Sequence, residues 1–149
     1  MLSTLDGIAG ATQLPAGVAL VSVVPCKDAR GRLFALEQPS PVPFSPVRTF
    51  VIRDVPPGQA RGRHAQSCHE FLWLLSGSCV ATVYDGRTRA TIHLRAEEHA
   101  LTMAPGVWIG LGDFEHGTVL LVLASKRYSE TQSFSEPQPA LIAAHTQRS

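Results

Sequence analysis

The sequence contains few cysteines, and these form no motif. Its three cysteines are Cys26, Cys68 and Cys79, and no two of them have C-x-x-C spacing. An odd count without metal-ligand spacing disfavours both a disulfide framework and a zinc site. We therefore expect reduced thiols in a cytoplasmic protein. Cys79 lies within a predicted strand, where we expect it to be a small core residue.

Charge of one sign and long apolar segments are also missing. The formal net charge is +1, which gives no footprint for nucleic acid or for an anionic membrane surface. No uncharged apolar run approaches the length of a membrane span. Residues 1–20 contain Asp6 and no Lys or Arg, so no signal peptide is predicted. Nucleic acid and membrane are therefore not expected as partners.

The composition is that of an ordinary globular protein built from short β-type segments. With 149 residues, 44% hydrophobic and 17% charged, the chain fits one domain with a real core. Turn signals separate nine predicted strands at residues 17–25, 32–38, 47–54, 71–75, 79–84, 87–94, 100–104, 107–111 and 117–125. No long helical period competes with them. The pattern predicts an all-β sandwich or barrel.

The two ends of the chain differ from this central part. Residues 1–16 show no periodicity and are predicted to be a flexible N-terminal arm, and residues 17–131 form the β domain. Residues 132–149 are predicted to be a tail, in which 139–144 either form a short helix or stay loose. The segment 39–46 carries four prolines, which remove backbone donors and fix φ, so we expect a connection there.

The segment 58–77 is the most informative part of the sequence. It holds His64, Gln66 and Glu70 between the turn glycines Gly58 and Gly77. An apolar run at 71–75 follows Glu70 directly. Residues two apart in a strand share a face, so His64 and Gln66 are predicted to point the same way. Polar groups that converge beside core-forming residues indicate a lined pocket.

Arginines cluster around this segment, at Arg48, Arg53, Arg61 and Arg63. Two interpretations stay open at this point. The arginines are either a solvated surface set or a phosphate site, because the guanidinium group matches phosphate oxygens in a bidentate way.

The segment resembles the first cupin motif. The pattern is Gly58, five residues, His64-x-Gln66, three residues, Glu70, six residues and Gly77, and Pro105-Gly106-Val107-Trp108 resembles the core of the second motif. Over roughly residues 22–132 the chain resembles one branch of that superfamily, the nucleotide-sugar 3,4-ketoisomerases of the FdtA, QdtA and WxcM-like group. The further fragments that carry this resemblance are Asp28-x-Arg30-Gly31-x-Leu33, Glu37, Pro43-Phe44, Arg48, Arg61-Gly62-x-His64-Ala65, Gly77-Ser78, Asp85-Gly86, Pro105-x-x-Trp108, Val122-Leu123-Ala124-Ser125 and Tyr128-x-Glu130.

The resemblance implies an all-β fold, a single cupin (RmlC-like) jelly-roll β-barrel, usually dimeric. It implies a dTDP-linked 4-keto-6-deoxyhexose as the small-molecule partner and no cofactor. The ketone would move from C4 to C3 by base-mediated enolisation, a reaction that suits a group titrating near neutrality.

The resemblance also assigns roles to individual residues. His64 matches the proton-transfer histidine, and Glu70 is expected to be a pocket acid or a hydrogen-bond acceptor. The expected substrate-binding residues are Arg48, Arg61, Gln66 and Trp108. Trp108 either stacks on the substrate or belongs to the core.

The chain departs from the family pattern at two positions. Gln66 stands where the family has a second histidine, and Ile109 stands where the family often has one. An amide can orient a substrate oxygen but cannot shuttle a proton at neutral pH. The set His64, Gln66, Glu70 and Ile109 holds only two ordinary metal ligands, so no metal is expected.

These departures leave two alternatives to the isomerase. One is a repurposed cupin, either a natural-product cyclase or a small-molecule-binding barrel. The other, weaker one is a metal-dependent cupin.

The remaining histidines are predicted to lie outside the pocket. His69 alternates away from Glu70 and is expected to face outward. His93, His99, His116 and His145 are expected on the surface.

Overall fold

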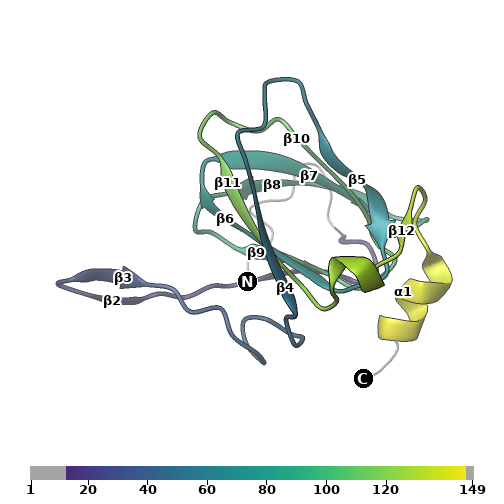
Figure 1. Cartoon of the computed structure of the whole chain (residues 1–149), viewed down its shortest axis with the longest axis horizontal. Helices are drawn as coiled ribbons and strands as arrows, with labels where there is room; N and C mark the ends of the chain where they lie inside the picture. The colour runs from purple at the N-terminus through teal and green to yellow at the C-terminus, as the bar shows by residue number, and fades with distance from the viewer. Residues whose placement is uncertain (1–12, 147–149) are drawn as a thin grey trace.

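A computed structural model describes residues 13–146, and its regular secondary structure is almost entirely β-strand (Figure 1). The strands of the two main sheets are β1 (Val18–Val21), β4 (Arg48–Arg53), β5 (Arg61–Gln66), β6 (Glu70–Ser76), β7 (Ser78–Tyr84), β8 (Arg89–Arg95), β9 (Ala100–Met103), β10 (Trp108–Gly112), β11 (Val119–Ala124) and β12 (Ser133–Phe134). A separate hairpin consists of β2 (Cys26–Asp28) and β3 (Gly31–Leu33). A 3-10 turn, η2 (Tyr128–Glu130), and one helix, α1 (Pro139–Thr146), follow.

The strands form two five-stranded antiparallel sheets that face each other. Their orders are β1-β9-β6-β11-β4 and β12-β5-β10-β7-β8, so most neighbours within a sheet are distant in sequence. Crossing of this kind between two facing sheets is the arrangement of a jelly roll. The predicted all-β jelly roll is confirmed.

The core between the sheets follows from a period of two along the strands. In β7 the side chains of Cys79, Ala81 and Val83 are buried and their neighbours are not. Cys79 is thereby confirmed as a small core residue. Alternation of this kind puts one face of each sheet into the core and leaves the other toward solvent.

Strand β6 breaks the alternation because both of its faces are covered. Leu72 and Leu74 belong to the core between the sheets, whereas Phe71 and Trp73 pack on the opposite side against Val42. The proline-rich connection that follows β3 supplies this second layer, so it covers part of the sheet as well as linking strands. Each fully buried side chain of this size contributes about 1.5–3 kcal/mol to folding.

The predicted strand at 32–38 is wrong beyond Leu33. Residues 34–38 make no ladder, and Phe34 instead packs its ring 4.9 Å from that of Trp73. The short remainder pairs with β2 around the turn at 28–31, and the hairpin β2–β3 projects away from the barrel (Figure 1). All six residues of its two strands are exposed.

The chain after η2 returns to the barrel. β12 pairs with the end of β5, and in α1 the side chain of Ile142 is buried. Gly106 makes this approach close: it has φ +96°, and a Cβ there would lie 2.7 Å from the Gln138 carbonyl oxygen. Of the two alternatives for 139–144, the structure has the helix. The predicted arm lies largely outside the described residues, and the predicted domain boundaries remain predictions.

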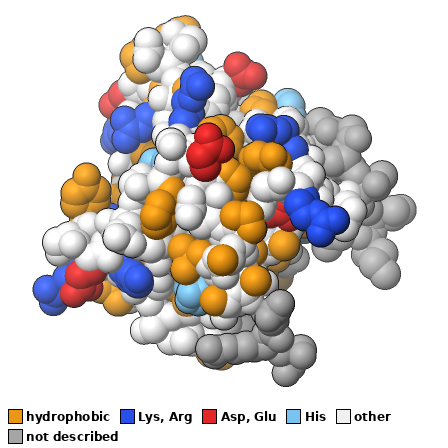
Figure 2. All heavy atoms as spheres, turned by 90° about the vertical axis from the view of Figure 1, so that its right-hand side faces the viewer, with side chains coloured by type: hydrophobic (Ala, Val, Ile, Leu, Met, Phe, Trp, Pro, Cys, Tyr) orange, Lys and Arg blue, Asp and Glu red, His pale blue; other side chains and the backbone are white. Residues whose placement is uncertain are grey.

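The surface carries no large region of one charge on the face shown in Figure 2. Basic and acidic side chains alternate there with apolar ones, in keeping with the net charge of +1. Within residues 13–146, no helix has both the length and the apolar composition that a membrane crossing requires.

Candidate active site

A cavity of about 410 Å³ lies between the two sheets. Both sheets and η2 contribute to its wall, which is apolar except for a few convergent polar groups. Its lining residues are Arg48, Phe50, Ile52, Arg61, Gly62, His64, Gln66, Glu70, Leu72, Ile109, Leu111, Val122 and Tyr128. The size and the mixture of groups are those of a small-molecule site.

Strand β5 presents two of the predicted side chains to this cavity. His64 and Gln66 both line it, and Ala65 between them is fully buried elsewhere. The predicted common orientation of His64 and Gln66 is confirmed. It follows directly from the two-residue period of a strand.

A bulge brings a further part of β5 to the cavity. The pairing of β5 with β10 shifts between Ile109 and Gly110, and Gly62 and Arg63 both have left-handed φ values, +75° and +64°. Bulges of this kind re-aim side chains next to functional sites. Arg61 and Gly62 consequently both line the cavity, although they are consecutive in sequence.

Glu70, the first residue of β6, is a buried carboxyl in the cavity wall. Its side chain is 7% exposed, and burial raises its pKa to about 7, against an opposing effect of the Arg48 guanidinium. At neutral pH, a carboxyl group with this pKa is present partly as the acid and partly as the anion. It can therefore both donate and accept a proton.

His64 is shifted in the complementary sense. Burial lowers the pKa of its imidazole below the usual value. The ring is therefore neutral at pH 7 and offers a nitrogen lone pair. The cavity thus holds one neutral base and one partly protonated acid, which are the groups that proton transfer requires.

Arg48 supplies the positive charge of the cavity. Its guanidinium carbon lies 5.1 Å from the ring centroid of Phe50 and 5.6 Å from that of Tyr128, so the group is held between two aromatic rings. Its Nε is the one buried polar side-chain atom among residues 13–146 without a hydrogen-bond partner. An unpaired buried donor costs about 1–3 kcal/mol, which an acceptor on a ligand would offset.

Five of the six predicted site residues meet in this cavity, and Trp108 does not. Trp108 lies beside Ile109 in β10, and only Ile109 faces the cavity. The Trp108 ring is 6.0 Å from the Arg89 guanidinium, which also stacks 4.2 Å from Tyr84. The structure therefore favours packing on the outer side of the sheet over contact with a ligand.

The sequence interpretation missed the roles of two lining residues. Phe50 lies two residues after Arg48 in β4, so the two-residue period of a strand was a usable signal for it. Tyr128 lies in an irregular segment, where no periodicity assigns a direction to a side chain. Its position over Arg48 comes from tertiary structure alone.

His69 is outside the cavity, as predicted, but it is not a solvent-facing residue. Its ring is half-buried, stacked at 5.6 Å on Phe44 and 5.5 Å from the ring of His145. The strand alternation gave the direction correctly. The covering layer comes from segments distant in sequence, which alternation cannot show.

The metal-ligating capacity of the cavity is limited to His64 and Glu70. Within residues 13–146, no three His, Cys, Asp or Glu side chains lie close enough together to hold a metal ion.

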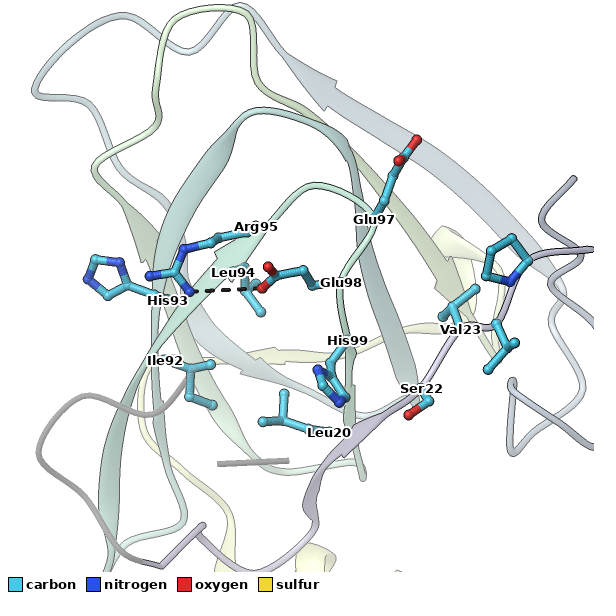
Figure 3. Close-up of a pocket in the computed structure, with 12 residues that line it drawn as sticks. Leu20, Ser22, Val23, Ile92, His93, Leu94, Arg95, Glu97, Glu98 and His99 are labelled. Carbon is cyan, nitrogen blue, oxygen red and sulfur yellow. Dashed lines mark ion pairs between the residues drawn. The ribbon is translucent and has the colours of Figure 1, made fainter. Parts of the chain in front are cut away.

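A second hollow, of about 480 Å³, lies between β1 and β8 (Figure 3). Its charged groups are largely paired: Arg95 turns toward Glu98 at 3.9 Å, and Glu97 bonds Arg32 of the hairpin at 2.6 Å. Among the described residues it contains no buried polar side-chain atom without a partner. Its charged groups are largely paired within the protein, and the cavity of His64 is therefore the candidate active site.

The jelly-roll sheets, with a largely apolar cavity between them that holds a few convergent polar groups, define the class as a cupin-type barrel. The family model FdtA, described as "WxcM-like, C-terminal", matches residues 16–139. The chain belongs to this family.

Individual relatives agree with this assignment. The TDP-4-oxo-6-deoxy-alpha-D-glucose-3,4-oxoisomerase of Aneurinibacillus thermoaerophilus is 37% identical over 105 residues, covering 70% of this chain and 76% of the relative. A mutant of the 3,4-ketoisomerase QdtA from Thermoanaerobacterium thermosaccharolyticum, solved with TDP-4-keto-6-deoxyglucose, superposes with a TM-score of 0.76 at 28% identity, covering 90% and 96% of the two chains. The WlaRB TDP-quinovose 3,4-ketoisomerase from Campylobacter jejuni superposes with a TM-score of 0.75 at 32% identity, covering 80% and 92%.

Proposed function

We propose that this protein is a sugar-nucleotide 3,4-ketoisomerase that moves the ketone of a dTDP-linked 4-keto-6-deoxyhexose from C4 to C3. The observation that carries the proposal is that a neutral histidine, His64, and a partly protonated carboxyl, Glu70, line the same cavity. Relatives that carry this activity by name, at up to 37% identity, support it.

The reaction begins with His64. Its neutral imidazole takes the acidic proton from C3, the electrons of that C–H bond form the C3=C4 double bond, and the C4 carbonyl electrons move to O4. The product of this step is an enediolate. Proton exchange between O3 and O4 and delivery of a proton to C4 then leave the ketone at C3, with no net change in oxidation state.

Glu70 is proposed as the second proton-transfer group. It stands in the cavity of a chain that has Gln66 at the position of a second imidazole. A carboxyl with a pKa of about 7 can supply the proton that C4 takes up and can be reprotonated from solvent.

Arg48 and Arg61 are proposed to bind the diphosphate or the sugar oxygens. Both line the cavity, and Arg48 is already held between two rings, with a free buried donor. A guanidinium fixed in advance loses little entropy when it binds a phosphate. For Trp108 we propose only a packing role on the sheet, because this residue does not line the cavity.

Two further features belong to the proposal. The fully exposed hairpin β2–β3 supports a homodimer, since an isolated two-stranded hairpin is marginally stable in water without a covering surface. The three free cysteines support a cytoplasmic location, because thiols stay reduced there. Light scattering coupled to size exclusion would give the mass, and a single 16.0 kDa species would contradict the dimer.

The test of the activity is to incubate the protein with dTDP-4-keto-6-deoxyglucose and to follow the sugar carbons by ¹³C NMR. A new ketone resonance at C3 is the expected result. Stabilisation by dTDP in a thermal-shift assay without any new ketone would contradict the isomerase and indicate a binding barrel instead. If dTDP does not stabilise the protein and no turnover is seen, the result would indicate a different class of ligand.

A further inference from the structure

Gln66 is the position at which this chain departs from its family, and its amide has a defined surrounding. The Cys68 sulfur lies 4.0 Å from Gln66 Oε1, in hydrogen-bonding geometry. Cys68 is 2% exposed, and burial, together with the nearby Glu70 carboxylate, raises the pKa of its thiol. The sulfur therefore carries its proton at neutral pH and can donate it to the acceptor end of the amide, while the Thr131 hydroxyl is a second hydrogen-bonding neighbour of the same sulfur.

The other end of the amide is left free. Among residues 13–146, Gln66 Nε2 makes no hydrogen bond and is not one of the buried unpaired side-chain atoms, and Gln66 as a whole is partly exposed. Gln66 lines the cavity, and its Nε2 consequently offers two N–H donors to a ligand there. An amide in the opposite orientation would place its acceptor oxygen in the cavity instead.

We propose that Gln66 donates a hydrogen bond from Nε2 to the ketone oxygen of the substrate, and that Cys68 is the positioning residue that holds the amide in this orientation. The inference rests on the proposed function and names the electrophilic group of the same site. When His64 removes the C3 proton, negative charge develops on O4. A fixed N–H donor at that oxygen is stronger toward the enediolate than toward the ketone, so it lowers the barrier.

The proposal accounts for the loss of an imidazole at this position. An amide cannot carry a proton between atoms, but it can stabilise the oxygen on which charge develops. Gln66 would stabilise the developing charge on the oxygen, as a protonated imidazole could, while His64 and Glu70 carry out the proton transfer.

The first arm of the test compares Gln66→Glu with wild type. Glutamate has the same shape, and its ionised form has acceptor oxygens only, so the comparison is made at alkaline pH, where this carboxylate carries no proton to donate. We expect deuterium exchange at C3 in D₂O to fall about a hundredfold, as on removal of one oxyanion donor, while dTDP affinity changes little. Gln59→Glu, an exposed change of the same kind, is the control. Equal exchange in wild type and Gln66→Glu would overturn the donor role and leave the isomerase standing.

The second arm tests Cys68. We expect Cys68→Ala to lower kcat about tenfold with little change in KM, because it loosens an interaction made in the transition state. Cys68→Ser, which keeps a donor, should restore most of the rate. In a Gln66→Leu background the Cys68→Ala change should have no further effect. Cys79→Ala, a buried cysteine of the core, controls for the cavity created. An undiminished effect in the Gln66→Leu background would overturn the positioning role.

The third arm does not depend on turnover. In ¹⁵N-labelled protein the Gln66 side-chain amide is assigned by its loss in Gln66→Glu, and dTDP-4-keto-6-deoxyglucose is added. Downfield movement of an Nε2 proton is expected. If the movement is seen while wild type exchanges no C3 proton, the isomerase fails and the donor role stands. No movement at a saturating concentration would overturn the donor role.

Discussion

At the scale of single residues, the environment sets the chemistry of the cavity. His64 and Glu70 are ordinary titratable side chains, and burial moves the pKa of the histidine down and that of the carboxyl up. Both shifts favour the uncharged form, which is the general effect of desolvation. The consequence is that His64, an uncharged base, lines the same cavity as Glu70, an acid near the midpoint of its titration at pH 7.

Substituting His64 by Asn tests the base. Asparagine keeps a polar side chain of similar size but cannot accept a proton. We expect His64→Asn to abolish detectable turnover while dTDP binding, measured by calorimetry, stays within a few-fold of wild type. His93→Asn, a change at an exposed histidine of β8, is the control and should keep full activity. Substantial turnover in His64→Asn would exclude His64 as the essential base.

Glu70 makes a prediction about stability against pH. Because its folded pKa, about 7, is above the ordinary glutamate value of 4.5, the folded state binds the proton more tightly than the unfolded state. This contribution to stability is fully present below pH 4.5 and is lost as the pH rises toward 7. Between pH 5 and pH 8, wild type should lose about 2–3 kcal/mol relative to Glu70→Gln.

Urea unfolding at the two pH values measures this difference. Glu136→Gln, at an exposed carboxylate, is the matched control and should follow wild type. A gap between wild type and Glu70→Gln that is the same at pH 5 and pH 8 would contradict the raised pKa.

At the scale of elements, α1 is attached to the barrel through a glycine rather than through a large apolar face. Gly106 lies in the turn before β10, where its left-handed φ and its missing Cβ let the chain at Gln138 approach. The backbone N–H of Gln138 donates to the Gly106 carbonyl at 2.9 Å. The Pro105-Gly106 pair of the second cupin motif thus has a structural role in this chain.

Replacing Gly106 with Ala should therefore destabilise the protein. The new Cβ meets backbone at 2.7 Å, and φ +96° is strained for alanine, so we expect a loss on the order of 2–3 kcal/mol by chemical denaturation. Gly58→Ala, with φ +82° and no heavy atom within 4 Å, isolates the strain and should lose about 1 kcal/mol. Gly112→Ala, with nothing within 4 Å and no positive φ, should be nearly neutral. Equal effects at Gly106 and Gly58 would show that the contact with α1 is unimportant.

At the scale of the whole molecule, the sequence predicts those parts that depend on local period. The two-residue repeat is enough to place His64 and Gln66 on one face and to find most strands. The same repeat separates Trp108 from Ile109, but the sequence alone does not say which of the two faces inward. Their assignment needed the partner strands of β10.

Other features arise from contacts between distant segments and have no local signal. Arg48 meets Tyr128 across 80 positions, and His69 meets His145 through a helix that returns to the barrel. Residues 34–38 alternate like a strand, yet they form no ladder, and Phe34 and Leu36 pack instead on the outer side of β6. The Gln66 amide oxygen lies 4.0 Å from the sulfur of Cys68, a thiol two residues away that is buried by the fold.

The central claim is that this barrel enolises a ketosugar, and deuterium incorporation at C3 tests it most directly. The purified protein is incubated with dTDP-4-keto-6-deoxyglucose in D₂O, and the C3 proton signal is followed by NMR. The account predicts that this signal disappears with wild type and persists with His64→Asn. Retention of the C3 proton over hours at high wild-type concentration would contradict the account.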